Sequence, residues 1–418
     1  MGKASRLAFD AGFLGNFGRM AVAAAAVCAG LSAQDLMSVS GGVGRPLFSD
    51  AAVLEAQETR KDVACTVDPI KPELGFDLKF HAGYEVTVPL NDLEGNGNHL
   101  TMVFRVVPAG RADAPVYMSQ HIAVPEIDAG AKGDAYLEGA FVVGEGKYHV
   151  SWLMRDRSER ICSSNWDIDA SLSARDKPIP LEIAAAQVQP DANELFKREP
   201  PPEHGRRDAS LHVKVLVNFA PQSSTSAAMQ PVDEVGLVAI LRNIAREPRF
   251  GRFSLVAFNM QEQRVVYRQE NSDRIDFPAL GAALRSLTYG TVQLKQLVEK
   301  HGDADFLGGL MTAEMCGARD KPDAVIFAGP KVTVEDAVPP DSLKQLAAVD
   351  FPIFYLNYLA NPAAVPWRDA IGGAVHYLKG SAFTISRPRD LFVAWGEIMR
   401  RIVESKEKKT AGGSLSSR

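Results

Sequence analysis

The sequence predicts two folded domains of different class: an N-terminal antiparallel β-sandwich and a C-terminal doubly wound, mostly parallel α/β domain. Three observations carry this prediction. Residues 63–170 contain short alternating apolar runs between turn residues, which is typical of a sandwich. From residue 209, apolar strand-like runs alternate with helical patterns, which indicates a parallel sheet with helices on both faces. Between them, residues 171–208 include three consecutive prolines and are expected to form a Pro-rich linker.

The N-terminus has the pattern of a secretory signal peptide over residues 1–34. Lys3, Arg6 and Arg19 precede a short apolar run of small residues at 20–33, and a basic segment before such a run directs export. The run is too short for a comfortable membrane span, although an uncleaved N-terminal anchor stays open. We therefore expect a secreted or periplasmic protein with no membrane span in its mature chain.

Export changes how the cysteines are interpreted. Cys28 leaves with the signal peptide, so Cys65, Cys162 and Cys316 remain. In an oxidising compartment two of the three can pair, and Cys65 and Cys162 bracket the sandwich segment. We expect a disulfide between them, with three unpaired thiols as the alternative, and we expect Cys316 to be buried.

Within the sandwich segment, strands are expected at 76–80, 84–90, 99–107, 116–124, 134–143 and 146–154. Trp152, shortly before Cys162, makes the segment resemble an immunoglobulin-like core, in which an aromatic side chain packs on a bridge between sheets. Residues 35–62 are expected to be a flexible extension because they mix Gly, Ser and charge.

The α/β segment, residues 209–404, is organised around the run at 211–219, which predicts a buried parallel strand. Further strands are expected at 253–258, 263–268, 323–328 and 353–358, and helices at 235–245, 277–287, 294–316, 342–349 and 391–403. Residues 405–418, rich in Lys and then in Gly and Ser, are expected to be a disordered tail.

This order of elements resembles a von Willebrand factor A-type (VWA) domain. The similar points are the first strand ending at Asn218, the hairpin at 253–268, Thr291 after a glycine, the strand at 323–327, and the Gly-Gly and Asp-Leu pairs at 371–392. The resemblance implies a Mg²⁺ site built from an Asp-x-Ser-x-Ser turn, a later Thr and an Asp after the fourth strand. It also implies protein binding at the carboxyl end of the sheet.

The residues of this chain depart from that metal motif. Asn218-Phe-Ala-Pro-Gln222 stands where the acidic turn belongs, and Ala328-Gly-Pro330 replaces the later acid. Mg²⁺ prefers carboxylate oxygens, and only Thr291 persists. We expect no cofactor. Ser223, Ser224 and Ser226 are either displaced ligands of a shifted turn or, as we prefer, hydroxyls that cap the following helix.

We call the carboxyl end of the predicted sheet the C-terminal lip, formed by residues 218–226, 289–291, 328–331 and 357–360. The candidate binding residues on it are Asn218, Gln222, Ser223, Ser224, Tyr289, Thr291, Gly329, Lys331 and Asn357. The resemblance implies a protein partner there. The net charge of -5 gives no attraction to nucleic acid.

Two other functions stay open beside a non-catalytic binding module. One is a hydrolase or other enzyme on a related α/β fold, with the loop at 223–226 at its centre. The sequence has no Gly-x-Ser-x-Gly or His-Glu-x-x-His motif, and His212, His376, His99 and His121 are interpreted as structural. The other is a structural envelope component in which the sandwich is the working domain.

Overall fold

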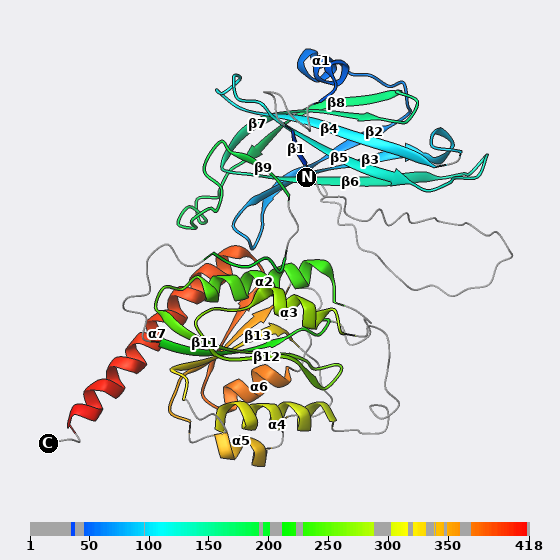
Figure 1. Ribbon diagram of the computed structural model, residues 1–418. Coiled ribbons are helices and arrows are strands. Elements are labelled where there is room, and N and C mark those ends of the chain that lie inside the picture. The colour runs from blue at the N-terminus through cyan, green and yellow to red at the C-terminus, as the bar shows by residue number, and fades with distance from the viewer. Residues whose placement is uncertain are drawn as a thin grey trace, which may run out of the picture.

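The computed structural model describes residues 35–37, 46–95, 97–191, 195–200, 211–222, 229–287, 302–316, 321–331, 338, 340–346, 349–359 and 369–415. They form a part with two antiparallel sheets and an α/β part, stacked on one another (Figure 1). None of the helices in these segments combines the length and apolarity that a membrane crossing needs. The predicted signal peptide lies outside the described residues.

The first part contains one five-stranded and one four-stranded sheet, with the orders β1-β5-β4-β7-β8 and β2-β3-β6-β9. Every strand pair in both sheets is antiparallel. The strands are β1 (Asp35–Met37), β2 (Thr66–Leu74), β3 (Phe80–Pro89), β4 (Asn98–Pro108), β5 (Val116–Val124), β6 (Asp134–Val143), β7 (Gly146–Arg155), β8 (Ile161–Ala170) and β9 (Val188–Pro190), with a short 3-10 turn, η1 (Leu90–Asp92). The expected antiparallel β-sandwich is therefore present in outline.

The inner faces of the two sheets share one apolar core. Phe104 of β4 lies against Phe141 of β6, with ring centroids 5.5 Å apart, and Tyr84 of β3 lies 5.5 Å from Trp152 of β7. Side chains alternate between the two faces of a strand. One set therefore fills this core while the other faces outward.

The disulfide predicted between Cys65 and Cys162 is confirmed. Cys65 directly precedes β2 of one sheet and Cys162 lies on β8 of the other, so the bridge connects the two sheets. Its Cα atoms are 6.4 Å apart, and Trp152 belongs to the same buried cluster.

The segment expected as a flexible extension, 35–62, contains secondary structure instead. β1 pairs with β5, and α1 (Phe48–Ala56) packs on the outer face of the five-stranded sheet. Val53 and Leu54 of α1 contact a cluster that includes Val103 and Leu153. The sequence analysis interpreted the segment from its Gly, Ser and charged residues and gave too little weight to the apolar pair at 53–54.

The strand expected at 76–80 is a turn between β2 and β3. The Gly75 and Lys79 backbones close it by a hydrogen bond of 2.9 Å, and Leu78 has a φ of 61°. Phe76 leaves the sandwich and packs on the core of the α/β part, with its ring 5.5 Å from that of Tyr358. The alternation of apolar and polar residues at 76–80 predicted a strand wrongly, because Phe76 packs against the other part of the molecule.

The expected linker, 171–208, is ordered over much of its length. β9 adds a fourth strand beside β6, so the sandwich extends past residue 170. Phe196 packs on the core of the α/β part. A Cβ on Gly281 would lie 2.5 Å from the ring of Phe196, so a glycine is needed there. Residues 201–210, which hold the last two of the three consecutive prolines, lie outside the described residues.

The α/β part is built on a six-stranded sheet of order β12-β11-β10-β13-β14-β15. All neighbours are parallel except β11 and β12. The elements are β10 (Leu211–Asn218), α2 (Pro231–Ala245), β11 (Phe250–Asn259), β12 (Arg264–Ser272), α3 (Phe277–Leu284), α4 (Gly302–Cys316), β13 (Ala324–Pro330), α5 (Pro340–Leu346), β14 (Ile353–Tyr358), α6 (Ala370–Tyr377), β15 (Ser381–Ile385) and α7 (Pro388–Leu415).

Helices cover both faces of this sheet. α2, α3 and α7 share one apolar core with it, and α4, α5 and α6 share a second core on the opposite face. Figure 1 shows α2 on the side that faces the sandwich and α4 to α6 on the far side. The sequence analysis missed α6 and β15, which are short.

The tail expected to be disordered, 405–418, continues α7 as far as Leu415. Its lysines have partners at the amino-terminal edge of the sheet. Lys406 lies 2.8 Å from Asp323, and Lys409 lies 3.5 Å from Asp350. Cys316, expected to be buried, is an exposed free thiol at the end of α4.

The Cys65→Ala/Cys162→Ala variant should lose about 2–5 kcal/mol of unfolding free energy, because the bridge constrains the unfolded chain across a sequence separation of 97. Urea unfolding would measure this. Cys316→Ala is the matched control and should change stability by about 0.5 kcal/mol or less. Equal stability of the two variants would contradict the structural importance of the bridge.

Candidate functional site

The C-terminal lip predicted from the sequence brings three of its residues into one row. Val217 of β10 pairs with Ala328 of β13, so Asn218 and Gly329 follow side by side. Gly329 in turn pairs with Asn357 of β14. Asn218 and Asn357 therefore lie on strands two apart, with a glycine between them.

Several predicted lip residues cannot be placed. Ser223, Ser224, Ser226, Tyr289 and Thr291 lie outside the described residues. The described members are Asn218, Gln222, Gly329, Lys331 and Asn357. Asn218 and Asn357 are buried, whereas Gln222 and Lys331 are half-buried.

The side-chain amide of Asn218 has one partner and one free donor among the described residues. Its Oδ1 accepts the backbone N–H of Met260 at 3.1 Å, which fixes the amide orientation and leaves Nδ2 turned away. Nδ2 is buried and has no partner among the described residues. Gly329 permits this arrangement, because a Cβ at 329 would lie 2.8 Å from the Asn218 Cβ.

Two acceptors lie on the same side of the sheet. Asn357 donates from Nδ2 to Thr384 at 3.4 Å, and its Oδ1 has no partner within the described chain. Asp369, directly before α6, also has a buried Oδ1 with no hydrogen-bond partner in the described chain. Burial raises the pKa of Asp369, while the amides of Gly372 and Ile371 and the charge of Lys331 oppose that rise.

We call Asn218, Asn357 and Asp369 the polar floor of the lip. Leu216, Phe327 and Tyr355, two residues before Asn218, Gly329 and Asn357, belong to the α4–α6 core. Side chains two apart in a strand share a face, so the row faces α4 to α6. Asp369 influences the pKa of the Tyr355 hydroxyl, which places its carboxyl near this row.

The described residues of the lip do not fit the Mg²⁺ that the VWA resemblance implies. Asn218 offers a cation only the neutral Oδ1 that already accepts the Met260 N–H, since its Nδ2 is a donor and cannot ligate. The end of β13 contributes a glycine. Asp369 is one carboxylate where Mg²⁺ favours charge from more than one. Within the described residues, no group of three His, Cys, Asp or Glu side chains could hold a metal.

His212 and His121, two of the histidines weighed from the sequence, each lie beside a hydroxyl group. His212 Nε2 lies 3.0 Å from Ser254 Oγ, and His121 Nδ1 lies 3.2 Å from Thr101 Oγ1. His99 and His121 come from paired strands β4 and β5 but sit opposite other residues.

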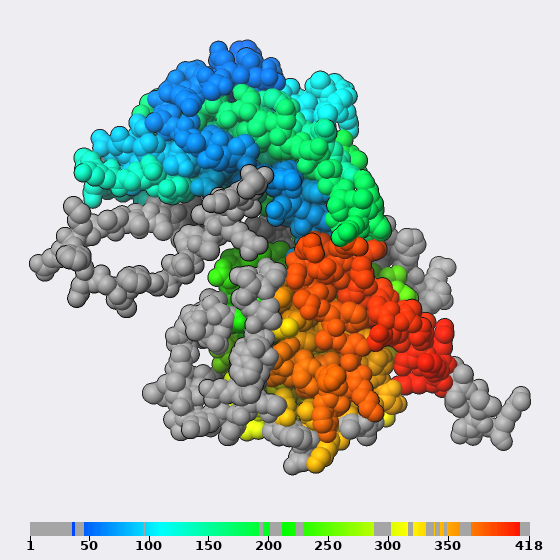
Figure 2. Space-filling model, turned by 180° about the vertical axis from the view of Figure 1, so that it is seen from behind, coloured from blue at the N-terminus to red at the C-terminus, as the bar shows by residue number. Residues whose placement is uncertain are grey.

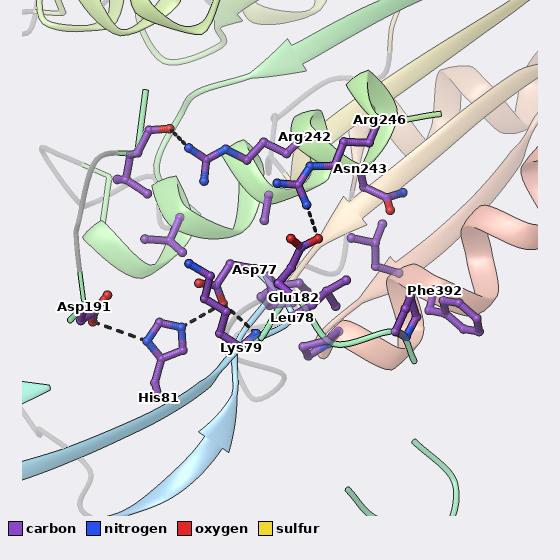
Figure 3. A pocket seen from close by; sticks show the side chains of 17 residues that line it. Asp77, Leu78, Lys79, His81, Glu182, Asp191, Arg242, Asn243, Arg246 and Phe392 are labelled. Atoms are coloured by element: carbon purple, nitrogen blue, oxygen red, sulfur yellow. Dashed lines mark hydrogen bonds and ion pairs between the residues drawn. The ribbon is translucent and has the colours of Figure 1, made fainter. Parts of the chain in front are cut away.

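A second candidate site, which the sequence analysis missed, is a pocket of about 330 Å³ between the two parts (Figure 3). The β2–β3 turn and the segment around β9 line one side of it, and α2 with the start of α7 lines the other. Figure 2, seen from behind relative to Figure 1, shows the two parts in contact. Pockets at domain interfaces are common binding sites.

His81 is held at this pocket between two carboxylates. Its Nε2 lies 2.9 Å from Asp77 Oδ1, and its Nδ1 lies 3.5 Å from Asp191 Oδ2. Burial lowers the pKa of His81, but the hydrogen bonds and charges of Asp191 and Asp77 outweigh burial and raise it to about 10. At neutral pH the ring is protonated, so it is unsuited to accept a proton as a general base.

The other side of the pocket is held by two arginines of α2. Arg246 pairs with Glu182 and, at 2.9 Å, with Glu199. Arg242 lies 2.8 Å from Glu199 and donates to the Leu195 carbonyl at 2.9 Å. These contacts attach the segments on either side of β9 to α2.

The pocket could not be found from the sequence because its groups are far apart along the chain. His81 and Asp191 are separated by more than a hundred residues, and α2 follows later still. Asp369 carried a weak signal, since Asp is favoured just before a helix.

Comparisons with known proteins assign no family. No family model matches the chain, and no curated protein matches its sequence. A solved glycoside hydrolase family 2 member from Bacteroides cellulosilyticus is similar over 78% of this chain and 39% of its own, with 10% identity and a TM-score of 0.19. A Bacteroides uniformis β-glucuronidase 2 is similar over 75% of this chain and 38% of its own, with 10% identity and a TM-score of 0.18.

A structural-genomics protein is similar over 28% of this chain and 95% of its own, at 11% identity and a TM-score of 0.19. The chain thus spans well under half the length of the two hydrolases. Resemblance at these TM-scores carries no conclusion about fold or activity.

Mg²⁺ should not stabilise the protein. Addition of about 10 mM MgCl₂, compared with NaCl of equal ionic strength, should shift Tm by less than about 1 °C. A ligand at a hundred times its Kd would add about 2.7 kcal/mol and raise Tm by several degrees. A rise of that size, reversed by chelator, would show that the lip holds a metal.

The His81→Gln variant should lose a pH-dependent part of stability. The pKa of His81 is raised from 6.5 to about 10 in the folded protein, so the stabilisation is fully present below pH 6.5 and lost as pH rises to about 10. Allowing for the partial exposure of the ring, we expect about 1–2 kcal/mol. Urea unfolding at several pH values would measure it.

His149→Gln is the matched control for this experiment, because His149 contacts only Asp167 among the described carboxylates, and that carboxylate is exposed. The difference between wild type and His81→Gln should shrink with rising pH, and His149→Gln, measured alongside, reports the effect of removing a histidine that contacts a single exposed carboxylate. If the stability difference between wild type and His81→Gln stays constant with pH, a protonated His81 does not hold Asp77 and Asp191 together.

Proposed function

We propose that this chain is an exported, non-catalytic protein-binding module that uses the C-terminal lip of a metal-free VWA-like domain. The observation that carries the proposal is the position of the polar floor. Numbered along the chain, the sheet has the order 3-2-1-4-5-6, the order of doubly wound folds, whose ligands bind where the strand order reverses. That point lies between β10 and β13, where Asn218 and Gly329 meet.

The single antiparallel strand at the edge, β12, supports the VWA-like interpretation, since it agrees with the hairpin on which the resemblance partly rests. The disulfide supports export, because structural disulfides persist in oxidising compartments. We therefore propose a secreted or periplasmic location after cleavage of residues 1–34, with an N-terminal membrane anchor as the alternative.

The floor and the rim of the lip have different roles in this proposal. Asn218 and Asn357 are buried and fixed by Met260 and Thr384, so they give the lip a rigid base. Gln222 and Lys331 are half-buried and are the described side chains that a partner would contact. Recognition would rest on shape and hydrogen bonds, without a cation that bridges to a partner carboxylate.

The enzyme and the envelope component remain the rival proposals. The enzyme would depend on the hydroxyls at 223–226, and the envelope component on the outer surface of the sandwich. The three proposals therefore place the essential residues on different surfaces, which allows one set of variants to separate them.

The test begins with affinity capture of partners by residues 35–418 from an extract of the native envelope, with and without chelator. Gln222→Ala/Lys331→Ala should then weaken the captured complex by about 10-fold or more, equivalent to about 1.4 kcal/mol. Lys321→Ala, at the opposite edge of the sheet, is the matched control and should bind as wild type does.

Each of the other outcomes contradicts a different part of the proposal. Loss of the complex in chelator would show that recognition needs a metal. Unchanged binding by the double variant, with folding intact, would exclude the lip as the interface and favour the sandwich. An activity abolished by Ser223→Ala/Ser224→Ala/Ser226→Ala would establish the enzyme.

A further inference from the structure

The outer face of the four-stranded sheet carries two large apolar side chains that are open to water. Ile70 of β2 is 48% exposed and Tyr136 of β6 is 60% exposed. Both belong to the outward set of side chains, since Tyr84 and Leu137 of the alternate set fill the core shared by the two sheets. Two exposed apolar side chains are common on a protein surface, so the face is distinguished by the residues between them.

A row of three carboxylates crosses this face between Tyr136 and Ile70. Asp68 of β2 pairs with Glu85 of β3, and Glu85 pairs with Glu138 of β6. We call these three residues the acidic row. Side chains directly opposite on antiparallel strands have Cβ atoms about 4.5–5.5 Å apart, and like charges in such positions repel. The acidic row therefore lowers the stability of the sheet that carries it.

The acidic row has no cation of its own. Within the described chain, no Lys, Arg or His side chain forms an ion pair with any of its carboxylates. The outer face of the five-stranded sheet differs in this respect. There Asp167 lies 2.7 Å from His149, and Asp169 lies 3.6 Å from Lys147. The negative charge of the acidic row is thus available to a partner.

The dimensions of the acidic row suit several cationic side chains. Neighbouring strands lie about 4.8 Å apart, so the row spans about 10 Å. No group of three acidic, His or Cys side chains among the described residues could hold a metal ion. In an extended peptide, alternate side chains lie about 7 Å apart on one side, so two basic side chains match the row. Beside it, the Tyr136 ring can contact a cation, and Ile70 can contact an apolar stem of Lys or Arg.

We propose that the outer face of the four-stranded sheet docks a basic segment of a partner protein. Two or more Lys or Arg side chains would lie in the acidic row, with their stems against Tyr136 and Ile70. Charge complementarity carries the choice of partner, because the face offers uncompensated carboxylates between two exposed apolar side chains. This surface belongs to the sandwich, so it is distinct from the C-terminal lip and goes beyond the proposed function.

Hexalysine is a suitable probe, with hexalysine acetylated on every side chain as its neutral control. Isothermal calorimetry with residues 35–418 in about 20 mM NaCl should give a Kd on the order of 0.1 mM for hexalysine. The affinity should fall at least about 5-fold in about 150 mM NaCl, because salt screens exposed charges. The acetylated peptide should bind at least about 5-fold more weakly than hexalysine, since it has no ammonium groups.

Two double variants locate the binding. Glu85→Gln/Glu138→Gln should weaken hexalysine binding at least about 5-fold. The same variant should raise Tm by about 1–3 °C, because it removes repulsion within the acidic row, and this rise separates lost binding from misfolding. Asp167→Asn/Asp169→Asn is the matched control, since it removes the same charge from the other sheet. It should bind hexalysine as wild type does.

Three results would overturn the proposal. The first is equal weakening by the two double variants, which would reduce the binding to net charge. The second is wild-type affinity in the folded Glu85→Gln/Glu138→Gln protein. The third is a rise in Tm with CaCl₂ that this variant abolishes, which would assign the acidic row to a metal ion. The lip variant Gln222→Ala/Lys331→Ala should bind hexalysine as wild type does, so the two proposals can fail independently.

Discussion

The burial of β10 on both faces is the constraint on which the α/β part depends. Val213, Val215 and Val217 point into the core shared with α2 and α7, and Leu216 into the core shared with α4 to α6. A central strand of this kind requires helices on both sides of the sheet. The exception is Lys214, whose buried ammonium lies 2.9 Å from Glu314 of α4. Glu314 also pairs with Arg268 of β12 at 2.6 Å. A buried charge needs such partners, so these ion pairs fix α4 against the sheet.

The same constraint determines where chemistry is available. Apart from His212 and Lys214, which have partners inside the fold, the strand is apolar, and a further polar side chain comes where it ends, at Asn218. Gly329 and Asn357 end the neighbouring strands in the same row, and Asp369 approaches with α6. A second group of polar side chains lies where the two parts meet. There His81 pairs with Asp77 and Asp191, and Arg246 pairs with Glu182 and Glu199.

The fold class was accessible from the sequence because burial leaves a strong local pattern, as at residues 211–219. The failures occurred where a residue serves a distant partner. Phe76 looked like part of a strand, but it packs on Tyr358 in the other part. β2 was missed because it contains two prolines, which an edge strand tolerates. For the candidate sites, Asn218 and Asn357 were named from their places at strand ends, while the cluster of His81, Asp77 and Asp191 had no local signal.

The packing of Phe76 and Phe196 on the α/β core has a consequence for how the molecule unfolds. Both rings come from segments that precede residue 209, yet they cover the same apolar cluster as α2, α3 and α7. A fragment starting at 209 would expose that surface to water and tend to aggregate. The sandwich and the α/β part are therefore coupled energetically, and heating the intact chain is expected to produce one cooperative transition for both.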